Sequence, residues 1–270
     1  MTLDRVLSLF EDSLTRRSAR NLYTAEGAEL YAAFVKSDEA EQAEVRYAGE
    51  ALPERATVGE LAAGEGRLLF SVPAERVSSY VALDSSPLLL GALARRAAEM
   101  GVDAQAVQAL HQDLLKWEPE PHAFDLLIFG AGTARLFDEG ERARIFSQVR
   151  NALKTGGRFY VSTSESLASS DRLICLGETE VRGRKVVVYF FDTNMREKKA
   201  REIGFVVFPI GQAGVAARVY SSIVLDLTAD ELVGELEAAG LAVEERIERE
   251  YESAAGIAEV TTSLIARIKE

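Results

Sequence analysis

The chain has 270 residues, of which 47% are hydrophobic, and a formal net charge of −12 at pH 7. This is enough apolar material for a substantial core, whereas the acidic balance repels phosphate at long range and excludes nucleic acid as a partner. No apolar stretch approaches the ~20 residues of a membrane span, so we expect no membrane partner.

The cysteine and histidine content further limits the possible compartment and the kinds of site. Cys175 is the single cysteine, which rules out an internal disulfide and favours the cytoplasm; we expect it to be packed as a small apolar residue. His111 and His122 are too few and too badly spaced for a metal site, so we predict no metal.

The first 50 residues are predicted to form helices and are interpreted as an N-terminal helical cap. Apolar residues between positions 3 and 10 suit an amphipathic helix. Tyr23 and Tyr31 lie further along this segment, and their spacing suits packing in a core as well as contact with a ligand.

The most informative stretch runs from Val58 to Asp84. An apolar run ends in Glu60, a turn of small residues follows, then a segment that we predict to be a helix, and a second apolar run ends in Asp84. These parts make the first βαβ unit of a nucleotide-binding sheet. Small residues let the backbone approach a ligand closely, and a carboxylate at the tip of the second strand can accept both hydroxyls of a ribose.

The α/β alternation continues along the next 80 residues. A third apolar segment ends near Asp113, and a run from Phe124 to Gly130 is a further strand. A helix is predicted from Asp138 to Leu153, closed by two glycines and followed by a fifth strand to Val161. Such alternation predicts a parallel sheet with helices on both faces.

The alternation of predicted strands and helices stops after this strand. Residues 172–226 contain apolar runs separated by turn signals and are predicted to be antiparallel strands inserted into the sheet domain. A capping box at Thr228 and Glu231 begins a helix that ends at Gly240. Two last strands, 241–247 and 260–268, are expected to form an edge hairpin.

These motifs, in this order, resemble the class I S-adenosylmethionine-dependent methyltransferases, over roughly residues 55–165 and more loosely over 220–270. The resemblance implies a Rossmann-like seven-stranded α/β sheet, S-adenosyl-L-methionine as cofactor and S-adenosyl-L-homocysteine as product. The expected domains are the cap (1–50), the cofactor-binding core (51–171), an inserted antiparallel β lid (172–226) and a final helix with the edge hairpin (227–270).

The resemblance also implies which positions contact the cofactor: Glu60, Ala62, Gly64, Gly66, Asp84, Ser85, Asp113, Leu114 and Gly130. Glu60 would help to hold the α-amino end, Asp84 would accept the ribose hydroxyls, and Asp113 would accept the adenine amine. Asp113 could instead cap the segment after it. Ala62 departs from the commonest pattern, which has glycine there, and we interpret the change as an adjustment of the cofactor-binding turn rather than a loss of binding.

No catalytic residue is certain, and the candidates are Tyr23, Thr133 and Arg135. Arg135 would orient a substrate group or lie solvated at the surface. Tyr23, Tyr31 and Glu165 are candidates for facing the substrate. An alcohol acceptor normally needs a base within hydrogen-bond reach, whereas a neutral amine does not, and residues 133–137 contain no His, Glu or Lys.

The predicted function is therefore N-methylation of a small-molecule or peptide amine. The layout resembles amino-sugar N,N-dimethyltransferases, the glycine or sarcosine type, and the methyltransferases that finish ribosomally made (daptide-type) peptides. The alternatives are an O-methyltransferase, for which Asp138, Glu165 or His111 would be the base, and a cofactor-binding scaffold without catalysis. The exposed edge of the β insertion also suggests a homodimer.

Overall fold

The computed structural model describes residues 20–23, 25–34, 39–166, 171–181, 183–211, 217–252 and 258–269. The amphipathic pattern predicted between residues 3 and 10 lies outside these ranges. The chain divides into two compact units. The core unit contains Ser37–Ser166, Leu227–Tyr251 and Glu259–Glu270, and the insertion unit contains Met1–Lys36, Leu167–Asp226 and Glu252–Ala258. The predicted cap of residues 1–50 is thus shared between the two units. No helix in the described ranges is long and apolar enough to cross a membrane.

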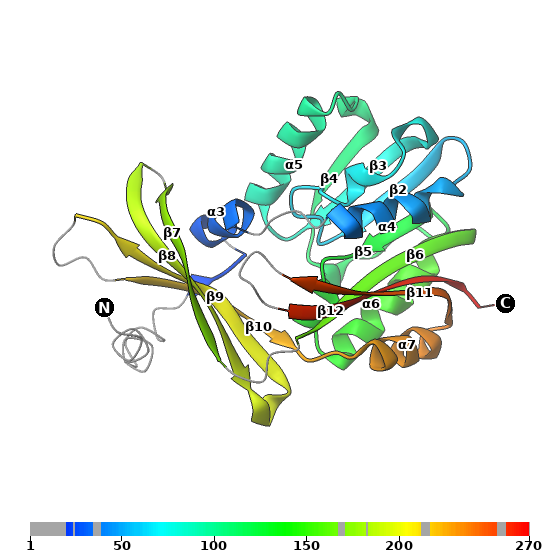
Figure 1. Ribbon diagram of the computed structural model, residues 1–270. Helices are drawn as coiled ribbons and strands as arrows, with labels where there is room; N and C mark the ends of the chain where they lie inside the picture. The colour runs from blue at the N-terminus through cyan, green and yellow to red at the C-terminus, as the bar shows by residue number, and fades with distance from the viewer. Residues whose placement is uncertain are drawn as a thin grey trace. The chain divides into compact units, whose positions relative to one another are not determined.

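The core unit is built on a seven-stranded sheet with the order β11-β12-β6-β5-β2-β3-β4 (Figure 1). Its strands are β2 (Ala56–Leu61), β3 (Val77–Asp84), β4 (Val107–His111), β5 (Phe124–Phe129), β6 (Leu153–Ser166), β11 (Leu241–Glu252) and β12 (Ala258–Ile268). Strands β6, β5, β2, β3 and β4 pair in parallel, and β12 is antiparallel to β6. The predicted Rossmann-like sheet is confirmed.

Four helices cover the two faces of this sheet. Helices α4 (Glu39–Glu50) and α5 (Pro87–Glu99) pack with one apolar cluster, and α6 (Glu139–Ala152) and α7 (Ala229–Ala238) pack with the other. The helix starts follow from local sequence: Asp138 and Thr228 each form a complete capping box, and Ser86 caps α5 ahead of a proline. The helices predicted after Asp138 and Thr228 are confirmed.

The crossover from β2 to β3 differs from the prediction. The expected helix is replaced by two 3-10 turns, η1 (Leu69–Ser71) and η2 (Ala74–Arg76). Pro73 explains the difference, because proline disfavours helical geometry at the residue before it. Val72 is accordingly extended, with φ −65° and ψ 139°. A further 3-10 turn, η3 (Ala104–Ala106), precedes β4, and η4 (Leu114–Lys116) and η5 (Thr133–Leu136) follow β4 and β5.

The insertion unit contains a five-stranded sheet in the order β1-β10-β9-β8-β7. Its elements are β1 (Arg20–Asn21), α3 (Ala25–Phe34), β7 (Arg172–Val181), β8 (Arg184–Met195), η6 (Arg196–Lys198), β9 (Ala200–Pro209) and β10 (Arg218–Leu225). Strands β7 to β10 pair with one another in antiparallel fashion, as predicted, and β1 pairs with β10 in parallel. Glu26 of α3 accepts hydrogen bonds from Arg218 and Tyr220 of β10. Cys175, expected to be packed, is exposed on β7.

Candidate functional site

The carboxyl ends of the parallel strands bring the predicted acids to one edge of the core sheet. Glu60 lies at the end of β2, Asp84 ends β3, and Asp113 follows β4 by two residues. Gly130 comes directly after β5. Strand β2 lies between β3 and β5, so the strand order reverses beside it. In open α/β sheets, ligands bind outside the carboxyl ends of strands at such a switch point.

The small-residue turn after β2 has a left-handed backbone at three positions. Ala62, Gly64 and Gly66 have φ values of 52°, 56° and 74°. A Cβ at Gly66 would come within 2.9 Å of the Phe70 ring, whereas a Cβ at Gly64 would meet no atom within 4 Å. Packing therefore demands glycine at position 66, and backbone conformation favours it at 64. Ala62 keeps the same conformation with a side chain, at a cost of roughly 1–2 kcal/mol.

Asp84 is locked to this turn by its carboxylate. One oxygen accepts a hydrogen bond from the backbone N–H of Gly64 at 2.7 Å, and the other accepts one from Ser86 at 2.7 Å. The side chain is buried, and burial raises its pKa, opposed by these two hydrogen bonds and by His111. A carboxylate has about four lone-pair sites, so Asp84 keeps acceptor capacity for two hydroxyls. This donor and acceptor set fits a ribose.

Ser85 and His111 lie beside Asp84. His111 Nε2 is 3.0 Å from the carbonyl oxygen of Ser85, which joins the end of β4 to the loop after β3. Ser85 itself is exposed. These contacts fix the loop that carries the predicted ribose acceptor.

Glu60 is 5% exposed, and its carboxylate accepts a hydrogen bond from the backbone N–H of Leu69 at 2.9 Å. Burial raises its pKa well above the ordinary value, and the negative charges of Glu41 and Asp84 raise it further. The hydrogen bond from Leu69 and the charge of Arg67 act in the opposite direction. Glu60 is therefore a buried acid at the centre of the edge.

Asp113 has the contacts of a helix cap. Its carboxylate accepts from the backbone N–H of Leu115 at 3.0 Å and lies 3.5 Å from the ammonium of Lys116. The side chain is exposed, so this cap leaves it open to a further donor. Leu114 buries its side chain in the core, which fixes the backbone of η4. The capping interpretation is supported, and adenine recognition by Asp113 and Leu114 stays a prediction.

The turn after β5 holds the remaining predicted positions. A Cβ at Gly130 would lie 2.2 Å from Leu68 and 3.0 Å from Glu41 Oε1, so glycine is required there. Thr133 begins η5 and bonds back to Gly130 through its backbone N–H at 3.1 Å. Arg135 is 7% exposed and donates to Ser164 Oγ at 2.7 Å. The interpretation of Arg135 as a solvated surface residue is therefore wrong.

The candidate bases are engaged in structural contacts. Asp138 caps α6 through the backbone N–H of Glu141 at 2.8 Å. Glu165 lies within β6, not after the strand as expected, and accepts from the backbone N–H of Ala229 at 3.2 Å. Glu165 thus contacts the start of α7. Its contact with a substrate stays a prediction.

Tyr23 and Tyr31 belong to the insertion unit. Their ring centroids are 5.4 Å apart at an interplanar angle of 67°, and both rings pack against the apolar cluster of that unit. Tyr23 lies in the turn before α3. These contacts account for both side chains as packing residues, and their role toward a substrate stays a prediction.

Two buried acids of α4 were not predicted. Glu41 accepts from the backbone N–H of Ala131 at 2.7 Å and from Ser162 at 2.6 Å. Glu44 accepts from Tyr160 at 3.0 Å and from Arg249 at 2.7 Å. The signal was available, because the buried positions of α4 follow the amphipathic pattern i, i+3, i+4, i+7 and i+8 with acids at the first two.

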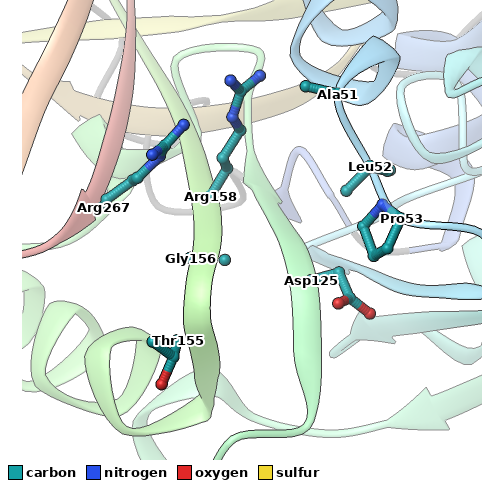
Figure 2. Close-up of a pocket in the computed structure, with 9 residues that line it drawn as sticks. Ala51, Leu52, Pro53, Asp125, Thr155, Gly156, Arg158 and Arg267 are labelled. Atoms are coloured by element: carbon teal, nitrogen blue, oxygen red, sulfur yellow. The ribbon is translucent and has the colours of Figure 1, made fainter.

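A small cavity of about 130 Å³ lies at the opposite edge of the core sheet (Figure 2). It is lined by residues that precede β2 and by the amino-terminal parts of β5 and β6, among them Pro53, Asp125 and Gly156. Asp125 there is paired with Lys154 at 2.6 Å. This cavity lies at the amino ends of the strands and is separate from the edge that holds Glu60 and Asp84.

Comparisons with known proteins agree with this geometry. Residues 58–157 match the family model of a methyltransferase domain. The search of curated proteins found no match. Among solved structures, an S-adenosylmethionine-dependent methyltransferase from Clostridium acetobutylicum is 14% identical, with a TM-score of 0.68 over 90% of this chain and 98% of that one. CalS10, an amino pentose methyltransferase from Micromonospora echinaspora with bound cofactor, is 17% identical, with a TM-score of 0.64 over 90% and 98%.

A third structure, the glycopeptide N-methyltransferase MtfA with bound cofactor, is 23% identical, with a TM-score of 0.52 over 84% of this chain and 94% of that one. At these identities the structures establish the fold, and the domain model covers the segment that carries the turn, Asp84, Asp113 and Gly130. Residues 58–157 thus match a methyltransferase domain, and the chain has the fold of the S-adenosylmethionine-dependent methyltransferases.

Proposed function

We propose that this protein is an S-adenosylmethionine-dependent methyltransferase that methylates an amine of a small molecule or peptide natural product. The cofactor would bind along the edge that holds Glu60, Gly64, Asp84 and Asp113. The observation that carries the cofactor assignment is the Asp84 carboxylate, buried at the end of β3 and fixed by two backbone N–H groups. A preorganised acceptor of this kind loses little entropy when it binds a ribose.

The bound cofactor supplies an electrophilic sulfonium methyl group. The chain's own residues then have to align an acceptor, and orientation contributes about 7–11 kcal/mol to such reactions. Asp138 is the acid nearest in sequence to the turn after β5, and it is used in the capping box of α6. Glu41, which lies against this turn, accepts hydrogen bonds from Ala131 and Ser162. A free amine needs no base for its attack, unlike an alcohol. These contacts favour an amine acceptor.

The similar structures support the same choice. CalS10 acts on an amino pentose, MtfA on a glycopeptide at nitrogen, and KedS8 from Streptoalloteichus is a sugar N-methyltransferase at 17% identity and a TM-score of 0.59. An amine is largely protonated at neutral pH, so the site has to favour its neutral form by excluding water. We therefore expect the rate to rise with pH until the bound amine is neutral.

The cofactor site is tested with Asp84→Ala. Each lost hydrogen bond to this charged acceptor is worth about 1.5–3 kcal/mol, so affinity for S-adenosyl-L-homocysteine should fall at least about tenfold in calorimetry. Asp125→Ala is the matched control. Asp125 is also a buried acid with a backbone N–H partner, but it lies near the start of β5, at the opposite edge of the sheet. Unchanged affinity of a folded Asp84→Ala protein would remove the assignment.

The acceptor is tested with labelled cofactor and a panel of amino sugars, amino acids and peptides, beside matched alcohols and phenols. Products are located by mass spectrometry and NMR. We expect one or two methyl groups on nitrogen, and no label transfer by Asp84→Ala protein at limiting cofactor. Methylation solely on oxygen would contradict the amine proposal while leaving the cofactor site intact.

A further inference from the structure

Glu41 connects helix α4 to the turn after β5. Its side chain is 6% exposed, and Oε1 accepts from the backbone N–H of Ala131 and from Ser162 Oγ. These partners are separated from it by 90 and 121 residues in the sequence. A tertiary contact, not a local one, therefore holds this turn.

The turn from Gly130 to Gly132 has a backbone conformation that needs tertiary contacts to stabilise it. Ala131 has φ 55°, a left-handed conformation that is unfavourable for alanine, and Gly132 follows with φ 62°. Strained backbone of this kind persists only where surrounding contacts determine it. The hydrogen bond from the Ala131 N–H to Glu41 is such a contact, and it is charge-assisted.

Gly130 completes the arrangement. A Cβ there would approach Glu41 Oε1 to 3.0 Å, so the carboxylate lies directly against the start of the turn. Ser162 Oγ, which donates to Glu41, also accepts from the backbone N–H of Gly132 at 3.1 Å. Glu41 and Ser162 thus hold Ala131 and Gly132 by hydrogen bonds, and Glu41 lies close to Gly130.

We propose that Glu41 is a positioning residue, which sets the conformation of the Gly130–Gly132 turn and thereby the part of the site that receives the amino acid end of the cofactor. The inference rests on the proposed placement of the cofactor at this edge. Glu41 also acts on Glu60, because its negative charge contributes to the raised pKa of that buried acid.

Glu44 provides the contrast for a purely structural role. It lies one turn further along α4 and is 9% exposed. Its partners are side chains of β6, β11 and β12, namely Tyr160, Arg249 and Ser263. It therefore stabilises the packing of α4 on the sheet through contacts that do not include the turn after β5.

The experiment compares Glu41→Ala, Glu41→Gln and Glu44→Gln in the full chain, with folding checked by circular dichroism and affinity for S-adenosyl-L-homocysteine measured by calorimetry. We expect Glu41→Ala to weaken binding about tenfold, the equivalent of one charge-assisted hydrogen bond. Glu41→Gln keeps an acceptor oxygen and should retain most of the affinity. Glu44→Gln should lower the melting temperature and leave affinity unchanged.

A second variant tests the mechanism directly. Glycine adopts positive φ without support, so Ala131→Gly in the Glu41→Ala background should restore part of the lost affinity. The inference is overturned if folded Glu41→Ala binds as the wild type does, or if Glu44→Gln weakens binding equally. Asp84→Ala separates the two proposals when Glu41→Ala has no effect. If Asp84→Ala also leaves affinity unchanged, the proposed placement of the cofactor is wrong. If Asp84→Ala weakens binding, the placement stands and only the proposed role of Glu41 is wrong.

Discussion

Ala62 and Ala131 adopt the left-handed conformation in the turns after β2 and β5, the two strands at the switch point of the sheet. Single residues of this kind cluster at ligand sites, where stability is exchanged for geometry. Alanine in place of the glycine of the common family pattern at position 62 therefore changes the backbone conformational energy as well as the side-chain volume. The turn keeps its shape although alanine disfavours it.

Replacing this alanine should stabilise the protein. Ala62→Gly removes roughly 1–2 kcal/mol of strain and adds about 0.5–1 kcal/mol of backbone entropy cost, so the free energy of unfolding should rise by up to about 1.5 kcal/mol. The measurement is urea unfolding. Ala63→Gly is the control, because Ala63 has no positive φ and should be destabilised by the change. Destabilisation of both variants would contradict the strain at Ala62.

The raised pKa of Glu60 predicts that this side chain lowers the free energy of unfolding at neutral pH. Its pKa is raised in the folded state, so between the ordinary value and the raised one the folded protein binds more protons than the unfolded chain. Stability therefore falls as pH rises through this window. Glu60→Gln should raise the melting temperature at pH 7, and the gain should shrink toward pH 4.

Paired thermal scans of wild type and Glu60→Gln across this pH range measure the effect. Glu54→Gln, at an exposed position before β2, is the control and should change little. If the rise in melting temperature caused by Glu60→Gln stayed constant down to pH 4, ionisation of Glu60 would not be its cause.

At the scale of elements, the sequence predicts the strands and helices of the core sheet and the cap at Thr228, because alternation, capping boxes and glycines act locally. It fails between β2 and β3, where the family pattern suggests a helix but Pro73 forces extended backbone at Val72. It also fails for Glu41, whose partners are distant in the chain and are brought together only by the sheet. The amphipathic pattern of α4 indicates that Glu41 is buried, but a local pattern cannot identify its partners.

The edge strand β7 is where the predicted homodimer would form. It is the last strand in the order of the insertion sheet, and it carries the exposed Cys175. Its register shifts between Cys175 and Gly177, and such a bulge limits pairing with another chain. Dimerisation through this edge stays a prediction.

Light scattering tests the homodimer, and the single cysteine locates its interface. If two β7 strands pair, mild oxidation should give a dimer linked through Cys175, which Cys175→Ser abolishes. A monomer at all concentrations would exclude the dimer. A dimer that does not cross-link would place the interface elsewhere.

At the scale of the molecule, the chain leaves the core unit after Ser166 and returns at Leu227. The two ends are tied together inside the core unit, since Thr163 Oγ1 donates to the carbonyl oxygen of Leu227 at 2.8 Å and Ala229 donates to Glu165 at 3.2 Å. A short glycine–serine linker can therefore replace residues 167–226. All the predicted cofactor positions lie in the unit that remains.

The interpretation of the insertion as a lid predicts separable functions. A shortened protein that starts at Ser37 and joins Ser166 to Leu227 through such a linker should fold cooperatively, because the apolar clusters on both faces of its sheet are retained. It should bind S-adenosyl-L-homocysteine within about threefold of the full chain, since it keeps every predicted cofactor position. It should transfer no methyl group. Calorimetry and the labelled-cofactor assay measure these two properties. Loss of folding would show that the units depend on each other, and full turnover would show that residues 167–226 are not a lid.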